Sequence, residues 1–262
     1  MYRLGIVSFI NTYPLIESLA QRADVALTPE TPRRLAELLL EGLLDAAIAP
    51  VAEYLVHRDR YQIIPGPCIG CRGDVQSVRL LSRRGIGEIR SLLLDPASLS
   101  SNLLARVILR ERFGLEPQLL ESPGRQDYLK RLRQPDADAA VVIGDLALRL
   151  HNGLEAHDFA VNLDLGRAWM EWTGLPFVFA VWLAPRSLDP APLTEMLCKA
   201  RDAGIRAIPA LAERAARSTG LPVSVCEQYL RHNVTYHLDD DHRRGLERFE
   251  RAVQPILEKE LV

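Results

Sequence analysis

The amino-acid sequence predicts an α/β protein that is divided into two lobes. Strand-like and helix-like segments alternate from the N-terminus, the alternation breaks once near residues 61–82 and then restarts, and the last third of the chain is helical. Alternation of this kind favours parallel sheets with helices on both faces. Because the series runs twice, we expect residues 1–94 plus 181–262 to form lobe one and residues 95–180 to form lobe two.

The first series starts at residues 2–9, which alternate in the manner of a strand, and a second strand is expected at residues 24–27. Thr31 is placed to cap the following helix, because its hydroxyl can accept from free backbone N–H groups. Gly42 can end that helix in a left-handed conformation, and residues 45–50 then form a short buried strand.

The second series starts with a strand at residues 91–95 and a helix that we expect Ser100 or Ser101 to cap and Gly114 to end. A helix over residues 125–133 and two further apolar strands follow, the second of them at 177–184. After that strand the pattern is helical, so no further strand is expected.

Composition excludes several classes of partner. The 262 residues carry 32 basic and 34 acidic side chains, a formal net charge of -2, so there is no global positive field for nucleic acid or anionic membrane. No apolar run approaches the roughly 18 residues of a membrane span, and the first residues lack the apolar core of a secretion signal. We therefore expect a cytoplasmic protein with neither a nucleic-acid nor a membrane partner.

The pattern of cysteine and histidine residues does not favour a metal site. Cys68 and Cys71 form a CxxC, but we place them in a Pro/Gly turn with no second pair to complete four zinc ligands. The acidic run that ends at His242 precedes a helix, where acids are expected from the helix dipole alone. Glycine-rich nucleotide loops are absent from the sequence, and we expect neither a metal nor a nucleotide.

Short polar residues gather at the junctions between strands and helices, where the carboxyl ends of parallel strands face a crevice. Asn11 follows the first strand, Ser77 lies between two strand-like runs, and Gly144 with Asp145 follows an apolar strand. Residues 100–102 (Ser-Ser-Asn) are the best anion site, because a helix N-terminus presents free N–H groups to a carboxylate. Simple capping of the helix is the alternative for these three residues.

An aromatic-rich loop, WMEWTGLPF, occupies residues 169–177. Its rings are suited either to cover a flat organic ring or to fill the space between the lobes. Composition alone leaves both interpretations open.

Together, five segments of the chain resemble the MqnA branch of the MqnA/MqnD family, and the last of them is the most specific. They are SFINTYPL (8–15), GDVQSV (73–78), LDPASLSSNLL (94–104), IGDLAL (143–148) and DLGRAWMEWTGLPFVFAVW (164–182). The resemblance implies a periplasmic-binding-protein-like type II fold with a cleft between the lobes. The sister branch opens with a Cys/Pro-containing stretch instead, which favours the MqnA branch here.

The resemblance also implies an activity. It implies a cofactor-free hydro-lyase that removes water from chorismate to give 3-[(1-carboxyvinyl)oxy]benzoate, the first step of the futalosine route to menaquinone. The partner expected is the small-molecule substrate, with a homodimer as an open question. Two alternatives remain, which are the sister 1,4-dihydroxy-6-naphthoate synthase and a non-catalytic intracellular protein that binds a small cyclic carboxylate.

The resemblance, together with the polar residues between strands and helices, predicts the residues of the site. We expect Asn11, Ser77 and Asp145 to act in catalysis. The residues expected to bind substrate are Ser8, Ser100, Ser101, Asn102, Gly144, Trp169, Thr173, Gly174 and Phe177.

The proton acceptor is not fixed by the sequence. Asp145 and Asp95 are the titratable motif residues that we consider, and either can instead orient a loop N–H group. Our hypothesis is that no dedicated protein base dominates and that the substrate's own enolpyruvyl carboxylate takes the proton.

Overall fold

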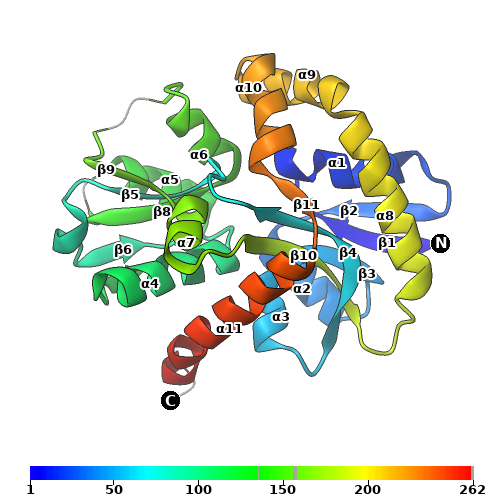
Figure 1. Ribbon diagram of the computed structural model, residues 1–262, viewed down its shortest axis with the longest axis horizontal. Coiled ribbons are helices and arrows are strands. Elements are labelled where there is room, and N and C mark those ends of the chain that lie inside the picture. Colours follow the sequence, from blue (N-terminus) through cyan, green and yellow to red (C-terminus); the bar gives the residue numbers. More distant parts are fainter. Residues whose placement is uncertain (135, 156–157, 261–262) are drawn as a thin grey trace. The chain divides into compact units, whose positions relative to one another are not determined.

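The computed structural model (Figure 1) describes residues 1–134, 136–155 and 158–260. The chain forms two compact units, each built from two segments. Unit 1 comprises Met1–Cys71 and Val178–Arg243, and unit 2 comprises Arg72–Phe177 and Arg244–Val262.

Within the described residues, unit 1 contains a six-stranded sheet with the order β11-β4-β10-β3-β1-β2. Strand β1 pairs in parallel with both β2 and β3, and β10 pairs antiparallel with β3. The strands are β1 (Tyr2–Ile6), β2 (Val25–Pro29), β3 (Ala46–Pro50), β4 (Tyr61–Cys71), β10 (Phe177–Pro185) and β11 (Thr235–His237).

The helices of unit 1 begin and end largely where the sequence signals lie. Thr31 caps α2, its Oγ1 accepting from the N–H of Arg34 at 3.3 Å, and Gly42 has a φ of +69°, so both expectations are confirmed. The elements are η1 (Ile10–Thr12), α1 (Tyr13–Ile16), η2 (Leu19–Gln21), α2 (Pro32–Leu40), α3 (Val51–Val56), α8 (Ala191–Arg206), α9 (Ile208–Thr219), α10 (Val223–Gln228) and the π-helical turn η4 (Tyr229–Asn233).

Helix α8 packs closely on α1 at Gly204. A Cβ atom added there would lie 1.8 Å from the carbonyl oxygen of Pro14, so only glycine allows this approach. The core beneath is apolar, with side chains such as Leu4, Leu15 and Trp182 almost fully buried.

The sheet of unit 2 has five strands in the order β7-β6-β8-β5-β9. Strand β6 is parallel to β7 and β8, and β5 runs antiparallel to β8 and β9. The strands are β5 (Val78–Ser82), β6 (Ser91–Leu93), β7 (Gln118–Leu120), β8 (Ala139–Ile143) and β9 (Val161–Asp164). The helices are η3 (Ile86–Glu88), α4 (Leu99–Phe113), α5 (Arg125–Arg133), α6 (Gly144–His151) and α7 (Leu165–Thr173), together with α11 (Asp240–Glu260) from Arg244 onward.

The two sheets share one plan. In each, three parallel strands lie in the order second, first, third, and an antiparallel strand follows the third: β2-β1-β3-β10 in unit 1 and β7-β6-β8-β5 in unit 2. The repeated β-α-β series in the sequence therefore corresponds to a repeated sheet topology.

The structure differs from the sequence expectations at several points of the fold. Residues 244–262, expected in lobe one, belong to unit 2, and the second boundary follows Phe177 rather than residue 180. The first unit boundary lies after Cys71 rather than residue 94, because β5 pairs with β8 and β9 of unit 2. The C-terminal region contributes a short strand, β11, that pairs with β4. Cys68 and Cys71 lie inside β4 rather than in a turn, and both are free and buried. Across the described ranges, no helix combines the length and the apolar character needed to cross a membrane.

Candidate active site

Asp95 organises the junction between β6 and α4 in unit 2. Its side chain is fully buried and accepts from the N–H groups of Ala97 at 3.0 Å and Ile143 at 3.3 Å. Nη1 of Arg125 lies 2.9 Å from its Oδ2. Burial raises the pKa of Asp95, although Arg125 and the two N–H groups act in the opposite direction. Asp95 therefore has the orienting role, and it ties the start of α4 to the end of β8.

The residue that caps α4 is Ser98, so the expectation of Ser100 or Ser101 is wrong. Ser98 has an extended backbone, as a capping residue must, and its side chain accepts from the N–H of Ser101 at 3.1 Å. Ser100 and Ser101 lie inside the first turn with buried side chains. Their hydroxyls are thus not needed for the cap.

The Asn102 side chain braces the same junction. Its Oδ1 accepts from the Asp95 N–H at 3.0 Å, and its Nδ2 donates to the Asp95 carbonyl oxygen at 2.9 Å. This pairing occupies both ends of the amide, so it gives Asn102 a structural role in shaping the helix start.

Ser77, Gly144 and Asp145 come together at one edge of the unit 2 sheet. Val78 is paired with Ile143, which sets Ser77 beside Gly144, and the Gly144 N–H donates to the Ser77 carbonyl oxygen at 2.8 Å. Gly144 has a φ of +67°, a conformation that glycine adopts without strain. Asp145 follows in the first turn of α6 and is partly exposed. Because Asp95 also binds the Ile143 N–H, the start of α4 lies at this same edge.

Asp164 is a buried residue at this edge that sequence reasoning missed. It caps α7 by accepting from the Arg167 N–H at 3.0 Å, and it also accepts from the N–H groups of Val75 and Gln76. Nη1 of Arg79 lies 3.3 Å from its Oδ2. The signal was available, since an aspartate directly before a helical run is typical of an N-cap. Its bonds to a loop far away in the sequence carried no local signal.

Trp169 and Phe177 pack within unit 2. Trp169 is fully buried, its Nε1 donates to the Pro176 carbonyl oxygen at 3.3 Å, and its ring lies 5.4 Å from Phe177 and 5.9 Å from Phe249 in edge-to-face contacts. Trp172 completes the cluster at 5.6 Å from Trp169. This geometry accounts for both predicted side chains by core packing.

Thr173 and Gly174 form the turn that follows α7. Thr173 Oγ1 donates to the Trp169 carbonyl oxygen at 2.8 Å and accepts from the Leu175 N–H at 3.2 Å. Gly174 ends the helix with a φ of +70°. Both residues shape the loop that is predicted to bind the substrate.

In unit 1, Ser8 and Asn11 follow β1. Ser8 is exposed, whereas Asn11 lies in η1 with a buried Oδ1 that no donor reaches within the part of the chain that the structure describes. Thr12 stabilises this loop, with its Oγ1 2.9 Å from the Val7 carbonyl oxygen and 2.7 Å from that of Phe9. A buried amide oxygen without a donor is costly in water-free surroundings, and a substrate hydroxyl would satisfy it.

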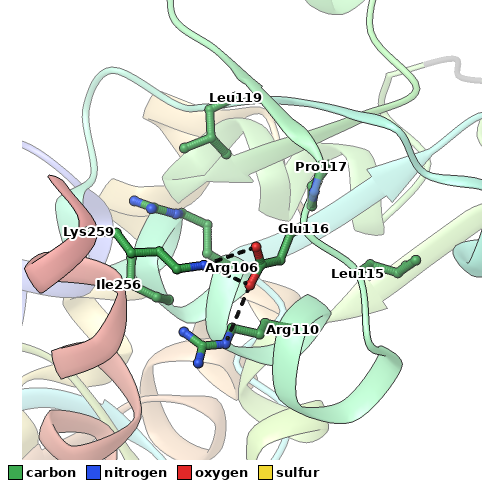
Figure 2. A pocket seen from close by; sticks show the side chains of 8 residues that line it. All are labelled: Arg106, Arg110, Leu115, Glu116, Pro117, Leu119, Ile256 and Lys259. Atoms are coloured by element: carbon green, nitrogen blue, oxygen red, sulfur yellow. Dashed lines mark hydrogen bonds and ion pairs between the residues drawn. The ribbon is translucent and has the colours of Figure 1, made fainter.

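A separate hollow in unit 2 lies between α4, the segment that leads into β7, and α11. Figure 2 shows Glu116 at its centre, with Lys259 Nζ 3.2 Å and Arg110 Nε 3.7 Å from its carboxylate oxygens. The predicted site residues do not line it. Its opposite charges pair with one another, as is typical of a solvated surface.

The acidic run before His242 serves to cap α11. Asp239 Oδ1 accepts from the His242 N–H at 2.9 Å and lies 2.7 Å from its Nδ1, so the interpretation of this run as a helix start is confirmed. Among the described residues, no group of three or more His, Cys, Asp or Glu side chains has the arrangement of a metal site.

The repeated sheet plan belongs to a periplasmic-binding-protein-like fold, as the family resemblance implied. A protein from Archaeoglobus fulgidus superposes with a TM-score of 0.77 at 14% identity, covering 100% of this chain and 98% of that one. The alkanesulfonate-binding protein of Xanthomonas axonopodis pv. citri gives a TM-score of 0.70 at 14% identity, over 98% and 92% of the two chains. A Candida albicans protein with the generic periplasmic-binding-protein fold gives 0.70 at 10% identity, over 97% and 90%.

The chain belongs to the family described as menaquinone biosynthesis, whose model matches residues 2–254, and the predicted family is thereby confirmed. Two relatives are named chorismate dehydratase. The one from Thermus thermophilus is 29% identical and aligns over 96% of this chain and 95% of its own. The one from Campylobacter jejuni is 23% identical and aligns over 96% and 97%.

Proposed function

We propose that this chain is a chorismate dehydratase, a hydro-lyase that converts chorismate to 3-[(1-carboxyvinyl)oxy]benzoate. The observation that carries the proposal is the near full-length similarity to two relatives of that name, within a family of menaquinone biosynthesis. The five sequence motifs support the same activity.

The reaction needs anion anchors and proton transfer, and no redox step. The ring loses the C3 proton and the C4 hydroxyl, which leave as water, and becomes aromatic. We assign one substrate carboxylate to the first turn of α4, where Ser100 and Ser101 lie and the helix dipole favours an anion. Ser77 and Asn11 are assigned to the second carboxylate or to the departing hydroxyl, and the buried Asn11 Oδ1 without a donor supports a role as acceptor.

The proton acceptor in our proposal is the substrate's own enolpyruvyl carboxylate. Asp145, partly exposed in the first turn of α6, is the alternative base. Asp145→Asn should keep most of its turnover under the first mechanism. If this variant folds normally and binds chorismate but loses several orders of magnitude in kcat, Asp145 becomes the base instead.

The activity is tested by incubating the purified protein with chorismate and separating the products by chromatography. Carboxyvinyloxybenzoate is the expected product. Tight binding without product would favour a non-catalytic binding protein. Absence of both binding and product would favour the sister 1,4-dihydroxy-6-naphthoate synthase. The cytoplasmic location and the homodimer stay predictions.

A further inference from the structure

The backbone that carries Ser77 is bent into a strained turn. Gln76 is the non-glycine residue with positive φ in the described chain, at +61°, and the Ser77 N–H donates to the Val75 carbonyl oxygen at 2.7 Å. A hydrogen bond from residue i+2 back to residue i, around a centre with positive φ, forms a γ-turn of the rare, strained kind. Side chains other than glycine adopt this region seldom, so surrounding structure must hold it.

The carboxylate of Asp164 stabilises this strained turn by accepting two hydrogen bonds from it. Its Oδ2 accepts from the Gln76 N–H at 2.7 Å, and its Oδ1 accepts from the Val75 N–H at 3.2 Å. Both N–H groups converge on this one carboxylate across the bend at Gln76, so the anion favours the strained turn over an extended path. Charge-assisted hydrogen bonds of this kind are stronger than neutral ones.

The carboxylate is itself held on rigid elements. Asp164 lies at the end of β9 opposite Arg79 of β5, and Nη1 of Arg79 is 3.3 Å from its Oδ2. The Arg79 guanidinium is in turn fixed by Asn162, whose carbonyl oxygen accepts from Nη2 at 3.2 Å. Both charged side chains are almost fully buried, which restricts them to one arrangement.

Ser77 is therefore fixed from two sides. The peptide groups before it are held by Asp164, and its carbonyl oxygen accepts from Gly144. We propose that Asp164 is a positioning residue that sets the location of the Ser77 side chain through the turn at Gln76, without touching substrate. The role of Ser77 in turnover rests on the proposed function.

If Asp164 holds the turn at Gln76 in this way, removing its charge should lower kcat and change KM little. In Asp164→Asn, one end of the side chain becomes an NH₂ donor that faces N–H groups and Arg79, so the turn relaxes. Displacement of a catalytic group by about 1 Å can lower turnover by about 100-fold, and we expect kcat to fall by about 10- to 100-fold. With Ser77 acting on the departing hydroxyl, KM should change by less than about threefold, because the anion anchor at α4 is untouched; a larger rise in KM would place Ser77 on the second carboxylate.

A second substitution separates positioning from mere stability. Glycine adopts positive φ freely, so Gln76→Gly in the Asp164→Asn background should restore the turn and recover about fivefold or more of the lost kcat. Asp138→Asn is the matched control. Asp138 also accepts from two consecutive N–H groups, those of Arg90 at 2.9 Å and Ser91 at 3.1 Å. It lies directly before β8, at the opposite end of that strand from Gly144, so its replacement should affect stability and leave kcat unchanged.

The proposal is overturned if Asp164→Asn lowers the melting temperature as Asp138→Asn does while kcat is unchanged, or if Gln76→Gly restores nothing. Hydrogen exchange gives a readout that does not need turnover. The amide protons of Gln76 and Ser77 should exchange faster in Asp164→Asn than in wild type. An unchanged exchange rate would contradict the proposal that Asp164 holds the turn at Gln76. If the wild-type protein forms no product, the proposed function fails. The exchange measurement still tests whether Asp164 holds the turn at Gln76.

Discussion

Replacement of Arg125 by methionine tests the buried ion pair that anchors the start of α4. Asp95 is fully buried in this pair, whereas Arg125 is 38% exposed. Methionine keeps the apolar stem of the arginine and removes its charge. The Asp95 carboxylate then keeps the N–H groups of Ala97 and Ile143 but loses its positively charged partner.

The expected cost follows from the burial of each partner. Removing one partner of a fully buried pair costs about 3–5 kcal/mol, because the remaining charge is uncompensated. Arg125 is more than one-third exposed, so water screens part of the interaction, and we expect about 2–3 kcal/mol at pH 7. For a chain of this size that corresponds to a drop in melting temperature of roughly 4–12 °C.

The stability loss in Arg125→Met should depend on pH, and the pKa of Asp95 determines the direction of that dependence. Burial already raises the pKa of Asp95 above its ordinary value, and loss of Arg125 raises it further. An acid whose pKa is higher in the folded chain holds more protons when folded, so its contribution makes stability fall as pH rises. The penalty of Arg125→Met should therefore be small near the ordinary pKa of aspartate and grow toward neutral pH.

Urea unfolding at pH 5 and pH 8 measures this difference. Arg131→Met on the same helix is the control, since its partner Asp136 is 39% exposed and the pair should contribute under about 1 kcal/mol. Adding Asp95→Asn to Arg125→Met should recover stability at pH 8, because the buried charge is gone. An equal loss at both pH values, or a loss no larger than that of Arg131→Met, would refute the reasoning.

Three further changes should act through packing and hydrogen bonds, each measurable by chemical or thermal unfolding. Trp169→Ala should cost roughly 3–5 kcal/mol, because a fully buried ring leaves a cavity; a cost under about 1 kcal/mol would mean that the ring is not core. Gly204→Ala should cost about 1–3 kcal/mol or more, since the new Cβ meets the Pro14 carbonyl oxygen, and an unchanged melting temperature would contradict this packing of α8 on α1. Asn102→Leu should cost about 2–4 kcal/mol by leaving both backbone groups of Asp95 without their partner, whereas a cost typical of an exposed position would argue against the brace.

The sequence predicts the α/β class and the two-part organisation well, because hydrophobic periodicity and capping residues are local signals. The sequence did not predict the boundary between the units or strand β11. The run VRLLS reads as a strand, but its letters do not say which sheet it joins. Strand β11 has three residues, too few for any period to be recognised.

Some features of the candidate site were likewise predicted from the sequence and others were not. The positions of Ser77, Gly144 and Asp145 follow from motifs at strand ends, and the structure brings them to one edge. The cap of α4 was misplaced from Ser98 to Ser100 or Ser101, because several serines in a row all satisfy the capping preference. Asp164 was missed as a support for the Ser77 turn, because its bonds to Val75 and Gln76 connect residues 88 or more positions apart.

The buried acids at this edge bear on the choice of proton acceptor. Asp95 and Asp164 each accept from backbone N–H groups, and each faces an arginine, Arg125 and Arg79. Their lone pairs are thus engaged in holding loops, which makes them poor bases, and their charges are offset, so they do not repel a substrate with two carboxylates. Asp145 differs from them in being partly exposed at this edge. Near-normal turnover of Asp145→Asn would therefore strengthen the case for the substrate carboxylate as base, since the other two acids are already engaged.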